Sequence, residues 1–339
     1  MLQLRGTLWQ SLLLFALAAL AATASFAQST VTLYGYGDMG VGKSVGTGEK
    51  TQFNPGTADV GGIRLGMKGS EDLGGGMKAN FQLETNGISE TGAGDGGYGR
   101  AAWFGLSGSF GAVQLGRQAR NSVSAGATGS AAGWRGTDVE AATGQRYSIN
   151  NNVAASSRNS AMINYITPTV NGFTARLGYV NAADNSKAAI TDVALMYSNG
   201  PLNLAYGQIK AQGKEANSGV HANYDLGMAT VYGSYNKRGA IAATANSYTV
   251  TGAANNAVTT TLVAGSAAVA AQDGFSVGAK VPFGATTVYA TYGKNNDSKV
   301  TAYELGADYA LSKRTALTAF TASTKGKDAG FFAGVRHAF

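Results

Sequence analysis

Charged side chains between residues 60 and 84 alternate with apolar ones. Arg64, Lys68, Lys78 and Glu84 occupy one phase of this alternation, and apolar residues occupy the other. A period of two places the two sets on opposite faces of strands. A packed core would not tolerate unpaired charges of both signs, so the charged face is expected to meet water. Such a face could attract and steer ions, while the other face must meet lipid or a second sheet.

The same phase relation recurs in later segments. Arg176, Lys280, Glu304 and Asp308 also lie out of phase with the apolar residues around them. We expect them to face the same water-filled space. The simpler interpretation of any single one of these residues is an ordinary solvated charge.

Three enzyme motifs overlap within residues 35–46. GDMGVGKS (37–44) has the spacing of a P-loop, and overlapping residues fit a dinucleotide fingerprint and a nucleophile elbow. All three require a following helix, but residues 45–62 contain Gly and Pro and have no amphipathic period. His221 and His337 have no catalytic context and are expected at the surface or rim of the fold. We therefore predict no catalytic, cofactor-binding or metal-ligating residue.

The first 27 residues have the pattern of a secretory signal. Arg5 precedes an apolar run at 12–20, and small residues lead to Ala27. The run is shorter than the ~20 residues of a spanning helix, which makes a membrane anchor the lesser alternative. Cleavage would leave residues 28–339 as one domain and lower the formal net charge from +7 to +6 through loss of Arg5.

The composition favours a large antiparallel sheet. The chain has no Cys, 4 Pro, 49 Gly and 16 Tyr, which suits paired strands joined by glycine-rich turns and excludes disulfides. Charged or polar residues interrupt every later apolar run. An exported chain of this kind is either a soluble protein or a β-barrel.

Sixteen segments with alternating polarity follow the signal, about the number that the remaining length accommodates at ~10 residues per strand. Arg100 shares the phase of Phe104 and Leu106, so we expect a bulge there or a strand that starts one or two residues later. The segments are 30–42, 60–71, 76–86, 100–108, 112–118, 158–167, 172–181, 190–199, 201–210, 219–226, 228–236, 273–282, 286–294, 300–310, 314–323 and 330–339.

The connections between these segments alternate in length. Seven short turns, such as DLGGG at 72–76, alternate with eight longer loops, the largest near 118–157 and 237–272. The stretch 240–271 is low in charge and is expected to be a surface loop. This asymmetry is typical of an outer-membrane barrel. The last segment ends on Phe339, in phase with Val335, and is expected to close against the first segment.

Five stretches carry a family resemblance: QSTVTLYG (28–35), RLGMKGSEDLGGGMKANFQLE (64–84), WFGLSGSFGAVQLGRQ (103–118), NYITPTVNGF (164–173) and GVRHAF (334–339). Together they resemble the general porins of beta-proteobacterial outer membranes. The resemblance implies an all-β, 16-stranded antiparallel transmembrane barrel with short periplasmic turns and long extracellular loops. It also implies a third loop folded into the barrel, a homotrimer, and passive diffusion that prefers anions.

The resemblance further assigns a pore constriction. By motif, its arginines are Arg64, Arg100 and Arg158, and its carboxylate is Glu84. Lys68, Lys78 and Arg176 would be further charges of the lumen. The sequence departs from the family pattern in two places: the family's basic pair at the fourth strand is Gly99-Arg100 here, and the third loop has no acid before Asp138 and Glu140.

The expected partners follow from this resemblance. They are two further copies of the chain, outer-membrane lipid and lipopolysaccharide, and small inorganic and organic anions as permeants, with no cofactor and no nucleic acid. One alternative is a substrate-selective channel, which would need an aromatic track along its lumen. Another is an exported sheet protein that acts as an adhesin or enzyme and dissolves without detergent.

Overall fold

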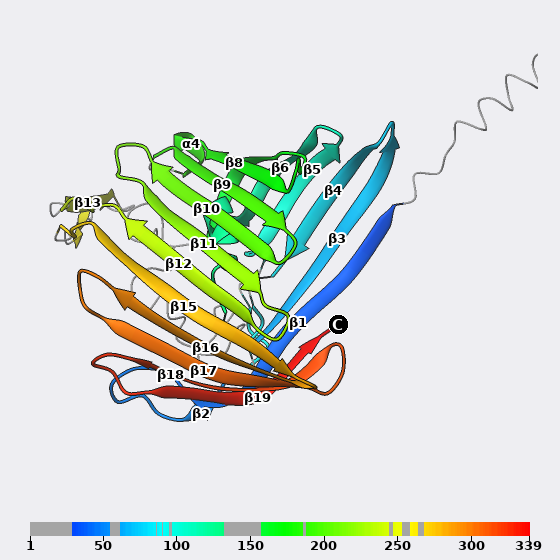
Figure 1. Ribbon diagram of the computed structural model, residues 1–339. Coiled ribbons are helices and arrows are strands. Elements are labelled where there is room, and N and C mark those ends of the chain that lie inside the picture. Colours follow the sequence, from blue (N-terminus) through cyan, green and yellow to red (C-terminus); the bar gives the residue numbers. More distant parts are fainter. Residues whose placement is uncertain are drawn as a thin grey trace, which may run out of the picture.

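The computed structural model is a closed antiparallel sheet (Figure 1). It describes residues 29–54, 62–85, 87–89, 91–94, 97–131, 157–185, 188–243, 247–252, 258–263 and 268–339. The main sheet has 17 strands, of which β2 (Gln52–Phe53) is a two-residue strand beside the end of β1. The wall therefore has 16 strands, as predicted.

Each wall strand pairs with the next one along the chain, and their bounds follow the predicted segments closely. The wall strands are β1 (Thr30–Lys43), β3 (Gly62–Gly74), β4 (Met77–Glu84), β5 (Ala101–Gly108), β6 (Gly111–Ala119), β7 (Arg158–Ile166), β8 (Phe173–Val180), β9 (Ile190–Asn199), β10 (Leu202–Ala211), β11 (Asn217–Asp225), β12 (Thr230–Arg238), β15 (Gln272–Phe283), β16 (Thr286–Asn295), β17 (Thr301–Ala310), β18 (Thr315–Thr324) and β19 (Gly330–Ala338).

The two faces of the wall differ as the alternation predicted. Apolar side chains such as Leu33 and Phe104 stand on the outer face, where they are 63% and 67% exposed in the single chain. Residues in the opposite phase, such as Asp38, Asn164 and Thr318, are buried on the inner face. An apolar outside and a polar inside is the arrangement of a barrel that crosses a membrane.

The barrel closes between its first and last strands, as predicted. The first part of β1 pairs with β3, from Thr30 opposite Ser70, while its second part pairs with β19, from Tyr36 opposite Ala338. The N–H and C=O of Gly35 both bond to the backbone of Phe339, at 3.0 Å each. A side chain on Gly35 would overlap the ring of Phe339, so the ring packs directly on the backbone of this glycine.

The connections differ from the prediction in three respects. β3 continues through a bulge to Gly74, so the first reversal uses two residues rather than the whole of 72–76. Connections 212–216, 296–300 and 325–329 have five residues each, no longer than the short turn 167–172 at the other end. The stretch 240–271, expected to be a plain loop, contains a hairpin of β13 (Ser247–Gly252) and β14 (Val258–Val263).

Helices are few in the described ranges. α2 (Asn121–Ala127) follows β6, and α4 (Ala182–Asn185) follows β8. Neither has the length and apolar character needed for a membrane span.

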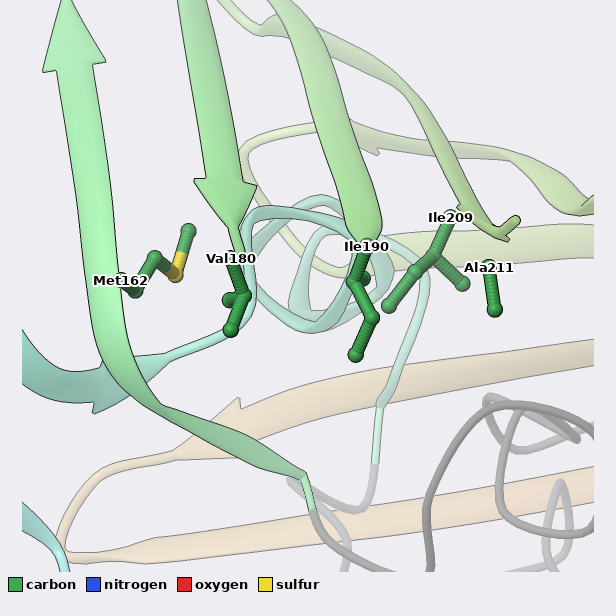
Figure 2. Packing of buried hydrophobic residues seen from close by; sticks show 5 residues of the cluster. All are labelled: Met162, Val180, Ile190, Ile209 and Ala211. Carbon is green, nitrogen blue, oxygen red and sulfur yellow. The ribbon is translucent and has the colours of Figure 1, made fainter. Parts of the chain in front are cut away.

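A small apolar core lies inside the barrel rather than between sheets. Met162, Val180, Ile190, Ile209 and Ala211 project from neighbouring strands into one row, beside the coil of α2 (Figure 2). A second group joins Ala125 of α2 to Ala194 and Ala205 of the wall. The start of the third loop therefore packs on the inner wall, as an inward-folded loop requires, whereas residues 132–156 lie outside the described residues.

Candidate functional site

The inner wall of β3, β4 and β5 carries the predicted charges on its water-facing side. Across β1, β3 and β4, Tyr36 lies opposite Arg64 and Gly66 lies opposite Glu84. The hydroxyl of Tyr34 donates a 2.7 Å hydrogen bond to Glu84 Oε2. Strand pairing thus determines both which charged side chains point inward and which of them are neighbours.

Arg100 joins Glu84 because β5 begins one residue after it. Had β5 started at Arg100, strict alternation would have turned this side chain outward with Phe104. Instead the strand begins at Ala101, and Arg100 precedes it with its N–H bonded to the carbonyl of Glu84 at 3.0 Å. Its Nε forms an ion pair with Glu84 Oε1. The later strand start that the sequence suggested is therefore confirmed.

The four residues assigned to the constriction come together in space. The charges of Arg100, Arg64 and Glu84 all act on the guanidinium of Arg158, which is half-buried at the start of β7. Three arginines and one carboxylate give this group a formal charge of +2. The arginine group, as we call these four residues, forms one positive patch on the inner wall.

Sequence reasoning missed Arg117, whose charge also acts on Arg158. In the segment 112–118 it shared the phase of the lipid-facing Val113 and Leu115. Opposite Arg117, β7 has a bulge: two residues, Ser160 and Ala161, lie between the partners of Gly116 and Gln118. Arg117 Nε donates to the carbonyl of Gly99 at 2.5 Å, and its Nη1 donates to Ser160 Oγ at 2.7 Å. Ala161, with a φ of 49°, lies at this bulge, and being an alanine it gives no sequence signal for it.

The other predicted lumen charges also stand on the inner face. Lys68 lies 5.5 Å from the ring centre of Tyr34, and Lys280 lies 5.6 Å from that of Tyr232. Arg176 lies between Ile166 and Ala194 in register, and Lys78 lies between Asp72 and Ser107. The basic residues are therefore spread over several strands of the interior.

Carboxylates gather near the seam of the barrel. Asp308 forms an ion pair with Arg336, in which Oδ2 lies 3.7 Å from Nη1. Asp38 of β1 lies opposite Arg336 in the pairing of β1 with β19. Glu304, on the same strand as Asp308 and in the same phase, is 1% exposed. The predicted acids of the third loop, Asp138 and Glu140, lie outside the described residues.

Asp192 of β9 holds the beginning of the third loop. Its carboxylate accepts the backbone N–H of Asn121 at 2.5 Å and that of Ser122 at 3.0 Å. The Asn121 side chain donates to Asn164 Oδ1 at 2.9 Å and to the Asp192 carbonyl at 3.0 Å. Gly207 of β10 lies directly beneath the helix, since a Cβ there would lie 3.0 Å from Ala125 Cβ. These contacts fix α2 against the wall.

Arg120 sits at the start of this loop and is fully buried. Its Nε donates to Asn159 Oδ1 at 3.0 Å. Burial lowers the pKa of this guanidinium to about 10, and the charge of Asp192 opposes that shift. The group is therefore charged at neutral pH, and Asp192 partly neutralises it.

The prediction for one histidine is wrong. His337 is on the outer face near the seam, but His221 is 4% exposed on the inner wall. Gly129 of the third loop packs against His221. The loop therefore covers this histidine, which lies neither at the rim nor at the outer surface of the barrel. Within the described ranges, no group of three or more histidine or acidic side chains is arranged to hold a metal ion.

The glycine motif at residues 37–44 is also accounted for. Residues 37–43 belong to β1, where Gly40 packs against Gly334 of β19. A Cβ on Gly40 would overlap the backbone of Ala333 and Gly334, so close strand contact explains this glycine.

The closed sheet, its apolar exterior and its charged interior define a transmembrane β-barrel with a polar lumen. The family model described as Gram-negative porin matches residues 15–329. The chain therefore belongs to the Gram-negative porin family and is an outer-membrane pore-forming barrel.

Individual relatives agree with this assignment. Outer membrane porin protein 32 of Delftia acidovorans is 32% identical, over 93% of this chain and 90% of that protein. An outer membrane porin protein of Bordetella pertussis is also 32% identical, over 97% of this chain and 100% of that protein.

Solved structures share the fold. The anion-selective porin from Comamonas acidovorans aligns with a TM-score of 0.62 at 23% identity, over 92% of this chain and 100% of that one. The trimer form of OmpT from Vibrio cholerae aligns with a TM-score of 0.65 at 17% identity, over 92% and 99% of the two chains. At these identities the two structures support the barrel architecture only.

Proposed function

We propose that the pore conducts small solutes by passive diffusion and prefers anions. The observation that carries this proposal is the arginine group, in which Arg64, Arg100 and Arg158 surround the single carboxylate of Glu84. An anion that sheds part of its hydration in a narrow passage regains favourable interactions with fixed positive charge. The name of the Comamonas relative supports the same preference.

The magnitudes favour nearby charges over the net charge of the chain. At physiological salt the screening length is ~8 Å, so charges farther away act weakly on a permeating ion. Two unit charges 4 Å apart interact with about 4 kcal/mol at an effective dielectric constant of 20. The arginine group is therefore expected to dominate ion selectivity, with Lys68, Lys78 and Arg176 in supporting roles.

The third loop would complete the constriction. In this proposal, Asp138 and Glu140 lie across the passage from the arginine group and narrow the range of accepted anions. The contacts of residues 120–131 with the inner wall support an inward course for this loop.

The assembled protein is proposed to be a homotrimer of residues 28–339 after removal of the signal at 1–27. The trimer form of the OmpT relative supports this state. Its surroundings would be outer-membrane lipid and lipopolysaccharide, and its permeants small inorganic and organic anions. No catalytic step, cofactor or nucleic acid is part of this function.

The test is a reversal potential in planar bilayers under a potassium chloride gradient. The unmodified protein should give a potential of the sign set by chloride, because the arginine group raises the local anion concentration. Arg64→Gln and Arg158→Gln should each lower the anion-to-cation permeability ratio by roughly two- to fivefold, as expected for loss of one charge near the ion path. A potential of the sign set by potassium in the unmodified protein would contradict the proposal.

Arg314→Gln is the matched control. This arginine lies in the short connection between β17 and β18 and is exposed, away from the arginine group. Its replacement removes the same charge from the chain. The permeability ratio should stay within about 20% of the original, because the charge lies beyond the screening length from the constriction.

A further inference from the structure

A pocket of about 400 Å³ lies on the inner wall of β1 and β3–β6. Its inward-facing lining includes Thr32, Lys68, Asn80, Gln82, Trp103 and Gln114. Lys68 is four residues beyond Arg64 along β3, ~13 Å nearer the short turns, while Gln82 borders the arginine group, since its Nε2 lies 3.5 Å from Glu84 Oε2. The volume falls in the usual range for small-molecule sites.

Lys68, Gln82 and Trp103 form one row across three strands. Lys68 lies opposite Gln82, and Gln82 lies opposite Trp103. Two strand spacings of ~4.8 Å put about 10 Å between the backbones of the lysine and the tryptophan. The row thus offers a cation at one end and an indole at the other.

Hydrogen bonds hold this row in place. Trp103 Nε1 donates to Gln82 Oε1 at 3.2 Å, and Gln82 Nε2 donates to the Tyr34 hydroxyl at 2.7 Å. Because its N–H is used within the wall, the indole keeps one orientation. Gly116 lies opposite Trp103 on β6 and brings no side chain next to the ring.

The remaining lining combines polar side chains with Phe81, Leu106 and Val113, and no carboxylate is among the residues that form the pocket. Asn80 Nδ2 donates to Ser107 Oγ at 2.9 Å, which presents an amide and a hydroxyl beside the row. Thr32 and Gln114 add further hydrogen-bonding groups at the two sides. A carboxylate on a solute would therefore meet the Lys68 ammonium group and neutral donors, while the Glu84 carboxylate, outside the lining, is already bonded to Tyr34 and Gln82.

We propose that this pocket is a binding subsite for a small carboxylate that bears a planar ring. The carboxylate contacts Lys68, the ring lies against the Trp103 indole, and ring substituents bond to the amides and hydroxyls. An inorganic anion can use only the lysine, and a neutral ring can use only the indole. The inference rests on the proposed function, because an anion must pass the arginine group to reach the subsite from the other end of the barrel.

Benzoate is the probe, and acetate is the carboxylate that lacks a ring. Each is added to single channels in planar bilayers, and the concentration that reduces the chloride current by half is measured. Benzoate should reduce the current at an at least fivefold lower concentration than acetate, because stacking on an indole adds to the shared carboxylate contact. Equal effects of the two solutes would overturn the proposal.

Two substitutions separate the two ends of the row. Trp103→Leu should raise the half-blocking benzoate concentration about fivefold and leave that of acetate unchanged, whereas Trp103→Phe should restore most of the effect. Lys68→Gln should weaken both carboxylates. Identical benzoate values for Trp103→Leu and Trp103→Phe would show that the ring does not contribute, and would overturn the assignment.

A second lysine–aromatic contact supplies the matched control. Lys280 lies over the ring of Tyr232 on the inner face of β12 and β15, outside the pocket. Tyr232→Leu should leave benzoate block unchanged, and an equal loss there would overturn the assignment to this pocket. The chloride reversal potential of Trp103→Leu should stay anion-preferring, which separates failure of the subsite from failure of the proposed pore function.

Discussion

Two parts of the inner wall use the same strand pattern for different purposes. The wall of β3–β5 presents Arg64, Glu84 and Trp103 to the lumen, among side chains joined by hydrogen bonds. The wall of β7–β10 instead presents Met162, Ala194, Ala205 and other small or apolar residues, which the third loop covers. We call them the bare wall and the covered wall.

The comparison shows that alternation determines which way a side chain points, while the neighbour determines its type. On the covered wall the neighbour is α2, so inward residues such as Ala194 and Ala205 are small and apolar enough to pack against a helix. The charged exception, Asp192, accepts two backbone N–H groups at the start of that helix. On the bare wall the neighbour is water, so most inward residues are charged or polar. Substitutions on the covered wall should therefore mainly lower the unfolding free energy. Those on the bare wall should have smaller effects on stability, and those that change a charge should alter ion selectivity.

The largest effect is expected from Asp192→Ala on the covered wall. It removes the acceptor of two backbone N–H groups and the charge beside the buried Arg120. Breaking a buried charge contact of this kind costs about 3–5 kcal/mol of unfolding free energy. Guanidinium unfolding in detergent, followed by tryptophan fluorescence, measures the change.

Asp225→Ala is the control for that substitution. Asp225 accepts one N–H, from Gly227 at 2.8 Å, in a short exposed turn. Its loss should cost no more than about 1 kcal/mol. Equal losses of unfolding free energy for Asp192→Ala and Asp225→Ala would contradict the proposal that Asp192 anchors the third loop.

Met162→Ala should have the next largest effect. Met162 is 0% exposed in the interior core, and its truncation leaves a cavity beneath the third loop, at a cost of about 3 kcal/mol. Its neighbour Ile163 faces outward and is 54% exposed in the single chain. Ile163→Ala should cost only about 1.5 kcal/mol, because lipid fills the vacated space and no cavity term is added. The same unfolding assay measures both costs. A larger loss of unfolding free energy for Ile163→Ala than for Met162→Ala would contradict the covered-wall assignment.

A smaller loss is expected from Tyr34→Phe on the bare wall. The substitution removes a donor to Glu84 and an acceptor for Gln82 while it keeps the ring. Because water of the lumen can replace part of these bonds, the cost should be about 1 kcal/mol. Tyr206→Phe on the outer face, where the hydroxyl accepts from Gln208, should cost less in the same assay.

The smallest effect is expected from Glu84→Gln, and it concerns selectivity. Loss of the one carboxylate in the arginine group should raise the anion-to-cation permeability ratio roughly twofold, the size of about 0.4 kcal/mol. The reversal potential under a chloride gradient measures it. Glu71→Gln, in the exposed part of β3 near its turn, should leave the ratio unchanged, and a fall in the ratio with Glu84→Gln would contradict the assigned sign.

The strands could be predicted from sequence because half of every strand meets lipid. That requirement fixes one phase of each strand, and Arg64, Lys68, Lys78 and Arg176 lie in the opposite phase of theirs. The phase of Arg100 carried the same information, since its conflict with Phe104 correctly indicated a later strand start.

The contents of the lumen were less predictable because no periodic pattern reports what lies over an inward residue. His221 was wrongly expected at the surface, and the covering Gly129 is nearly 100 residues away in sequence. The hairpin of β13 and β14 was missed because neither strand belongs to the wall, so no lipid-facing phase marks it. One signal was available: β9 and β10 carry small residues on their inner face, with Ala194 and Ala205 inward, which indicates a covered surface.

The seam between β1 and β19 has a consequence for how the chain folds. Neighbouring hairpins of the wall can form from local sequence, but Tyr36 and Ala338 meet only when nearly the whole chain is in place. The entropy cost of joining such distant segments is large relative to that of a two-residue turn, so this closure is expected to be a late step. Until then both terminal strands expose unpaired backbone groups to other chains. The ring of Phe339 meets Gly35 only at this step, so the contact stabilises the closed barrel and not the open intermediate.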